Sequence, residues 1–190
     1  MNISRKDPNK DQQPTKSMGR GMYTIAWLLG IGLLTLFFSG HEEKRHMQRI
    51  NPNQNPDSSI QDGQAQVVLK QNRQGHYVTN GTINGKEVTF LLDTGATDVS
   101  IPAHIADSID LKRGRSIPIS TANGNIKVYQ SWVKELGIGD IILEDVDANI
   151  NPEMRDDFIL LGMSALTKLE FTQRGNTLTL RTINPRNRSL

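Results

Sequence analysis

An aspartate at the end of an apolar segment is the residue whose position most strongly suggests chemistry in this chain. Asp93 follows the segment Val88–Leu92, which is apolar apart from Thr89. The residues directly after it are small: Thr94, Gly95, Ala96 and Thr97. Burying a carboxylate costs free energy unless the group is paired or used. The pattern therefore indicates a carboxylate that takes part in acid–base chemistry.

Two other roles for Asp93 are compatible with this pattern. Aspartate is common in turns, where its side chain accepts hydrogen bonds from nearby backbone amides such as those of Gly95 or Ala96. A phosphorylated aspartate is a further alternative, but the second aspartate usual two positions later is absent, since Gly95 stands there. The sequence around Asp93 favours the acid–base role over both.

The composition excludes several other kinds of chemistry. The chain has 190 residues, which allows one ordinary domain with an extension or two very small domains. It has no cysteine, so disulfides, thiolate catalysis and cysteine metal sites are excluded. Its four histidines lack ligand spacing, and 22 basic residues nearly balance 20 acidic ones. We therefore expect no metal, no cofactor and no nucleic-acid partner.

An uncharged apolar segment at residues 21–40 predicts a membrane anchor. Its 20 positions match the number of helical residues needed to cross a bilayer core. A cleaved signal peptide is the main alternative, but the sequence Phe38-Ser39-Gly40 places a bulky residue where a cleavage site needs a small one. We therefore expect an uncleaved transmembrane helix.

The charges on the two sides of this segment predict its orientation. Residues 1–20 contain five Lys and Arg, whereas the twenty residues that follow the segment contain three. Positively charged flanks stay on the cytoplasmic side. The sequence therefore predicts a cytoplasmic basic tail at 1–20 and a single span in a bacterial inner membrane. The rest of the chain is then periplasmic.

The remainder of the chain divides into a linker, a domain and a tail. Residues 41–65 are rich in Asn, Gln, Pro, Ser and Asp, which predicts a flexible linker. Residues 66–182 contain short runs of β-branched and alternating residues, with Asn-Gly hairpin signals within 83–86 and 121–124. We expect a mainly β domain of seven or eight short strands, with one or two short helices. Residues 183–190 form a polar tail.

Residues 66–182 resemble the retropepsin-like aspartic peptidases through three features. In outline, the resemblance is closest to the bacterial membrane-anchored members of that family. The three features are the segments INGKEVTFLLDTGATDVSIP, TANG and FILLGMSAL. The first is highly specific because it places Asp-Thr-Gly-Ala-Thr after an Asn-Gly hairpin and an apolar strand. The resemblance implies a closed β domain that corresponds to half of a two-lobed acid protease.

Peptide hydrolysis without a metal or a side-chain nucleophile requires two acid–base groups. One takes a proton from water and the other protonates or polarises the carbonyl. Two carboxylates in close contact can do both, because their mutual repulsion makes the pair share one proton. Asp93 lies in the only Asp-Thr-Gly of the chain. We therefore expect its partner to be Asp93 of a second copy across a two-fold axis.

The resemblance implies roles for other residues. Segment 94–97 supports the catalytic loop, where Thr94 ties the two loops together across the dyad and Gly95 allows close backbone approach. The hairpin of Thr121, Ala122, Asn123 and Gly124 is the flap that covers a peptide substrate. The strand that holds the catalytic loop from behind consists of Ile159, Leu160, Leu161 and Gly162.

The sequence departs from the retroviral members at two places. Met163 follows Gly162 where those enzymes usually carry an arginine, so the ion pair of that arginine is missing. The tail 183–190 is polar and does not resemble an interdigitating terminal strand. Two functions remain open: an active homodimeric aspartic endopeptidase, or a non-catalytic module for dimerisation or peptide binding. The intact Asp93 motif favours the endopeptidase.

Overall fold

The computed structural model describes residues 25, 27–34, 50–121 and 124–183. The chain divides into two units, residues 1–43 and 44–190. In the first unit, residues 25 and 27–34 are helical with exposed side chains. The rest of the predicted span 21–40 lies outside the described residues. Within the described part of the chain, no helix has the length and apolar character needed to cross a membrane.

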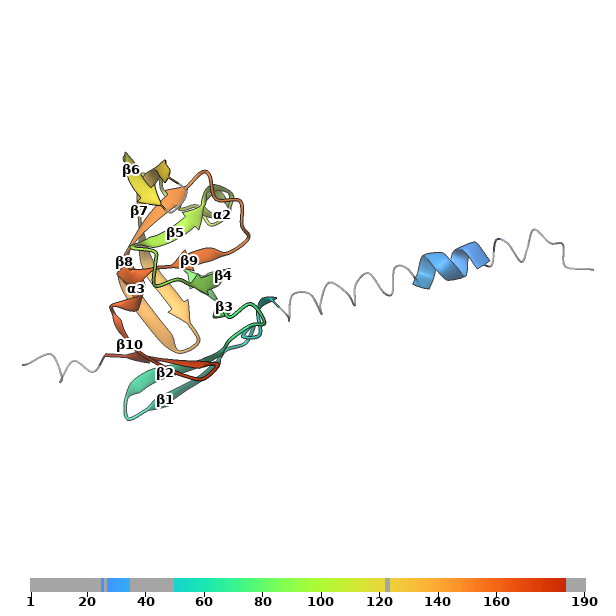
Figure 1. The fold of residues 1–190 in the computed structure, drawn as a ribbon, viewed down its shortest axis with the longest axis horizontal. Coiled ribbons are helices and arrows are strands. Elements are labelled where there is room, and N and C mark those ends of the chain that lie inside the picture. The colour runs from blue at the N-terminus through green and yellow to red at the C-terminus, as the bar shows by residue number, and fades with distance from the viewer. Residues whose placement is uncertain (1–24, 26, 35–49, 122–123, 184–190) are drawn as a thin grey trace, which may run out of the picture. The chain divides into compact units, whose positions relative to one another are not determined.

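The second unit contains a seven-stranded sheet that carries the predicted site (Figure 1). Its strands lie in the order β3-β4-β9-β5-β8-β7-β6. They are β3 (Val78–Ile83), β4 (Lys86–Leu92), β5 (Val99–Pro102), β6 (Ser116–Thr121), β7 (Gly124–Ile138), β8 (Ile141–Asn151) and β9 (Ile159–Leu161). Strand β3 also pairs with β7 through Thr82 and Ile83, which closes the sheet on itself. This confirms the closed, mainly β domain.

A second sheet pairs strands from the beginning of the domain's sequence with strands from its end. It has the order β1-β2-β11-β10, with strands β1 (Asp57–Gln61), β2 (Gln64–Lys70), β10 (Leu169–Arg174) and β11 (Thr177–Thr182). Ser58 connects it to the turn after β7, because its hydroxyl donates to the Asp140 carboxylate at 2.7 Å. In Figure 1 this sheet lies at the opposite end of the domain from the β6–β7 hairpin.

Two short helices complete the domain: α2 (Ala103–Ser108) and α3 (Met163–Leu166). Their number agrees with the prediction, and Pro102 directly precedes α2 while Gly162 directly precedes α3. Large apolar side chains fill the space between the elements. The largest fully buried ones are Phe90, Leu69, Ile83, Ile101, Leu136, Ile138, Ile141, Ile150, Ile159, Leu161, Leu166 and Leu180.

The predicted hairpin at residues 83–86 is confirmed in detail. Asn84 and Gly85 both have positive φ angles, 50° and 78°, and connect Ile83 of β3 with Lys86 of β4. Positive φ at both central residues is typical of a type I′ turn, which matches the twist of the strands. The turn therefore sets the register of β4, the strand that leads to Asp93.

The prediction that residues 41–65 form a flexible linker is wrong for residues 50–65. Residues 57–61 form β1, and the side chains of Asn51 and Asn53 are buried. The Asn53 side chain donates to the carbonyls of Lys70 and Val78 at 2.9 and 2.7 Å. Polar side chains therefore order this segment through backbone hydrogen bonds, without an apolar pattern. Residues 41–49 of the linker and 184–190 of the tail lie outside the described residues.

Candidate active site

Asp93 begins a loop that crosses over a strand from elsewhere in the sequence. Loop 93–98 joins β4 to β5, and β9 lies between these two strands. Strand β9 pairs in parallel with β4, so Leu161 lies beside Leu92, and the Asp93 amide continues the ladder to the Leu161 carbonyl at 3.2 Å. The backbone of Asp93 is therefore fixed by the strand that the sequence predicted behind the loop.

Residues at the end of β9 hold the other side of the loop. The amide of Met163 donates to the Ala96 carbonyl at 2.9 Å, and the amide of Ser164 donates to the Thr97 carbonyl at 2.8 Å. Gly162 has no room for a side chain, since a Cβ there would lie 2.7 Å from the Ala96 carbonyl oxygen. Glycine at this position therefore allows the loop to rest directly on the chain after β9.

Ser164 ties the loop to β8. Its hydroxyl donates to the Asp147 carbonyl at 2.7 Å and accepts the Val99 amide at 3.0 Å. One side chain thus connects the end of the catalytic loop with a neighbouring strand. Sequence reasoning did not single out Ser164, because the three segments that it joins are far apart in the chain.

The Asp93 side chain is half-buried in the single chain. Its Oδ1 accepts the Gly95 amide at 2.9 Å, so the local turn contact considered as an alternative role is present. This contact orients the carboxylate without blocking the cavity that Asp93 lines. The sequence suggested that the Asp93 carboxylate is buried, but it is only half-buried, and the neighbouring residues Thr94 and Gly95 are exposed. The loop surface around Asp93 is therefore open in one copy of the chain.

A cavity of about 400 Å³ extends from Asp93 to the predicted flap. It is lined by Asp93, Gly95, Ala96, Thr97, Asp98, Ser100, Ile119, Ser120, Thr121, Asn149, Asn151 and Leu160. Thr121 pairs with Gly124, and its hydroxyl donates to the Gly124 carbonyl at 2.8 Å. Gly124 has a φ of 114°, which favours glycine. Ala122 and Asn123 lie outside the described residues.

The structure brings together most of the predicted site residues. Of the strand behind the loop, Leu160 reaches the cavity, while Ile159, Leu161 and Gly162 are buried beneath the loop. Met163 is partly buried and packs against the hydrophobic core. An apolar side chain is therefore compatible with the position at which the retroviral members carry an arginine.

Several residues of the cavity were missed by sequence reasoning. Asp98 is half-buried and lines the cavity, although it follows the motif around Asp93 without being part of it. Ser100 and Asn149 lie side by side on β5 and β8. Polar residues within otherwise apolar strand segments were the available signal, because a buried polar side chain requires a partner.

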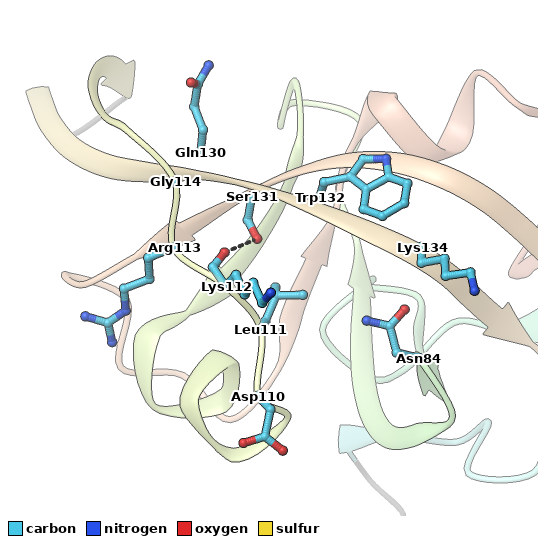
Figure 2. Close-up of a pocket in the computed structure, with 10 residues that line it drawn as sticks. All are labelled: Asn84, Asp110, Leu111, Lys112, Arg113, Gly114, Gln130, Ser131, Trp132 and Lys134. Carbon is cyan, nitrogen blue, oxygen red and sulfur yellow. Dashed lines mark hydrogen bonds between the residues drawn. The ribbon is translucent and has the colours of Figure 1, made fainter.

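A larger cavity lies elsewhere in the domain (Figure 2). Its volume is about 580 Å³, and it lies between the segment 110–114 and strand β7. It is lined by Asn84, Asp110, Leu111, Lys112, Arg113, Gly114, Gln130, Ser131, Trp132 and Lys134. None of the predicted site residues is among them. Figure 2 shows the Ser131 hydroxyl, which donates to the Lys112 carbonyl at 2.9 Å.

Two ion pairs involve residues that line this larger cavity. Lys86 contacts Asp110 at 2.8 Å, and its hydrogen bond and charge lower the pKa of the Asp110 carboxyl. Arg113 contacts Asp107 at 2.7 Å and lies 5.6 Å from the ring centre of Tyr129. Both ion pairs are exposed, and we interpret them as structural. Acid–base chemistry is better supported at the cavity that Asp93 lines. Within the described residues, no group of three or more acidic or histidine side chains could hold a metal.

Comparisons with known proteins agree with this geometry. A family model described as gag-polyprotein putative aspartyl protease matches residues 79–168, which include the loop, the flap strands and the strand behind the loop. Residues 79–168 of this chain therefore form a retropepsin-like aspartic peptidase domain.

Individual similar proteins extend this comparison. The chain is 34% identical over 124 residues to a protein of Sinorhizobium sp named "Uncharacterized protein in cobV 5'region". The match covers 63% of this chain and 53% of that protein, so the chain spans about half the length of this curated relative.

Two solved structures are also similar. A retropepsin-like aspartic protease from Rickettsia conorii superposes with a TM-score of 0.54 at 23% identity, over 67% of this chain and 96% of that one, which supports the fold. EIAV protease in complex with an inhibitor has a TM-score of 0.43 at 20% identity, over 52% of this chain and 92% of that one.

Proposed function

We propose that this chain is a membrane-anchored homodimeric aspartic endopeptidase. The observation that carries the proposal is the cavity that Asp93 shares with the flap strand. The Asp93 loop is held from behind by β9 and α3, while Thr121 of the flap lines the same cavity. A carboxylate on a rigid loop, facing a strand that can pair with an extended peptide, is what peptide hydrolysis requires.

In the proposed reaction two Asp93 carboxyl groups, one from each chain, share one proton and hold a water between them. The ionised group takes a proton from this water while the water oxygen bonds to the scissile carbonyl carbon. The protonated group gives its proton to the carbonyl oxygen. The carboxyl group that took the water proton then gives it to the amine nitrogen as the C–N bond breaks, and the other carboxylate takes back a proton from a hydroxyl of the intermediate. The Gly95 amide keeps each carboxylate oriented.

The non-catalytic alternative is a module that keeps the fold for dimerisation or peptide binding. It does not require an intact Asp93, because a binding module gains nothing from a pair of carboxylates at its centre. Incubating the full-length chain and its Asp93→Asn variant with a peptide library separates the two functions. We expect cleavage by the wild type and none by the variant.

The Asp93→Asn chain should remain folded, because the amide is nearly isosteric and removes a repulsive charge. Cleavage should persist in a chelator and with serine-directed reagents, and transition-state mimics of the statine type should block it. Cleavage by the Asp93→Asn variant would contradict the proposal, as would loss of activity in the chelator.

Residues 21–40 form the anchor in this proposal, and the peptidase domain lies in the periplasm of a bacterium. The support is the uncharged segment and the excess of basic residues before it. Alkaline phosphatase fused after residue 49 should be active, because it folds only outside the cytoplasm. Activity of a cytoplasmic reporter at the same position would reverse the orientation.

A further inference from the structure

A hydrogen-bonded polar pair forms part of the cavity wall beside Asp93. Ser100 of β5 and Asn149 of β8 are directly paired in a parallel ladder. Their exposed fractions are 7% and 4%, and the Ser100 hydroxyl donates to Asn149 Oδ1 at 2.9 Å. Both residues line the cavity. A polar pair is thus nearly buried at the place where a substrate side chain would enter.

Stability of the fold does not account for this pair. A hydrogen bond between two buried polar side chains contributes little net free energy, and two apolar groups of the same shape can replace it at almost no cost. The next residues on both strands are apolar and buried, namely Val99, Ile101, Ala148 and Ile150. A polar pair in this position therefore suggests recognition of a polar group.

The pair has hydrogen-bonding capacity left over. Asn149 uses its Oδ1, and within the described chain its Nδ2 amide has no protein partner although the residue faces the cavity. The Ser100 oxygen donates its only proton and keeps lone pairs that can accept. One donor and one acceptor therefore stand side by side, which is the complement of a carboxamide group.

The rest of the cavity discriminates among polar side chains. Ile119 and Leu160 provide apolar surface for the methylene groups of a side chain. Asp98 and Asp93 line the same space, so a carboxylate would meet like charge. The same carboxylates would attract a lysine or arginine, but such a side chain has only donors and would leave the Asn149 amide unpaired. Glutamine and asparagine satisfy all of these conditions.

We propose that Ser100 and Asn149 are specificity-determining residues that select a glutamine or asparagine side chain of the peptide substrate. This inference rests on the proposed peptidase function for its biological meaning. A site built to hydrogen-bond a polar group discriminates strongly against analogues that lack it, because the buried partners are left unpaired. We expect a preference for Gln or Asn over Leu of at least about tenfold.

The test uses the full-length Asp93→Asn chain as a trap for a randomised octapeptide library, followed by sequencing of the retained peptides. The wild type is incubated with the same library, and cleaved peptides are sequenced. We expect Gln or Asn to be enriched at one position in both sets. No retention above background, or retention without this enrichment, would overturn the inference. Enrichment by the trap without cleavage by the wild type would instead contradict the peptidase function.

Three variants in the trap background make the assignment specific. Replacing both partners, Ser100→Val with Asn149→Leu, should shift the enriched residue to Leu or Met. Asn149→Asp keeps the shape but removes the donor, so it should shift the enrichment to Lys or Arg even if the double variant does not fold. Ser131→Val, in the other cavity, should leave the Gln or Asn enrichment unchanged. An unchanged preference in Asn149→Asp would contradict the role of this pair.

Discussion

Gly162 lies directly beneath the carbonyl oxygen of Asp98, so close that a Cβ on Gly162 would overlap this oxygen. The Ala96 carbonyl oxygen would lie 2.7 Å from the same Cβ. Both oxygens belong to the backbone of the catalytic loop and cannot move away as a side chain could. The absence of a side chain at Gly162 is therefore a condition for the position of Asp93.

We predict that Gly162→Ala displaces the loop and lowers the free energy of unfolding by about 3 kcal/mol. Peptidase activity should be lost even below the unfolding temperature, because the loop position sets the catalytic geometry. Gly175→Ala is the matched control: its φ is 59°, and open space surrounds it. Gly175→Ala should lower the free energy of unfolding by about 1 kcal/mol, because only backbone strain is introduced. Chemical denaturation compares the two, and equal losses of stability would contradict the proposed overlap.

Ser164 gives a second test of the loop support. Ser164→Ala leaves the Val99 amide and the Asp147 carbonyl without their partner, which should lower stability by about 1–3 kcal/mol. Ser164→Thr retains a hydroxyl and should restore much of the loss. Ser108→Ala, at an exposed serine, should change stability by no more than about 0.5 kcal/mol. A Ser164→Ala chain as stable as wild type would show that these bonds do not hold the loop.

The start of the folded domain provides a third prediction. Asn53 makes three side-chain hydrogen bonds, which include acceptance of the Lys70 amide at 2.7 Å. Asn53→Ala should therefore lower the free energy of unfolding by about 3 kcal/mol, since it leaves several buried backbone groups unpaired. Asn176→Ala, at an exposed turn, should be nearly neutral. Thermal unfolding measures both, and a neutral Asn53→Ala would restore the interpretation of residues 50–65 as a linker.

Local signals in the sequence account for the parts of the fold that could be predicted. Asn84 and Gly85 indicated a hairpin because both residues tolerate the positive φ angles that the structure shows. The apolar run before Asp93 indicated a strand. Segment 50–65 was misinterpreted because Asn51 bonds to the distant Asn80 side chain and Asn53 bonds to distant backbone carbonyls. Such bonds leave no periodic pattern in the sequence.

The site could be predicted only in part for the same reason. Asp93 was identified through its motif, and the strand at 159–161 through a family resemblance. The hydrogen bond between Ser100 and Asn149 joins residues 49 positions apart. Ser164 joins Val99 and Asp147. Such contacts depend on parallel strand pairings, which the sequence of either strand alone does not specify.

The shared pair of Asp93 residues is the central claim of the proposed mechanism. Specific activity on a cleavable peptide should be measured over a wide dilution range of the full-length chain, together with sedimentation. We predict that activity follows the fraction of dimer, and that mixing the wild type with an excess of the Asp93→Asn chain suppresses it, because mixed dimers lack one carboxylate. Concentration-independent activity of a monomer would contradict this account, and Asp98, which lines the same cavity, would become the candidate second acid.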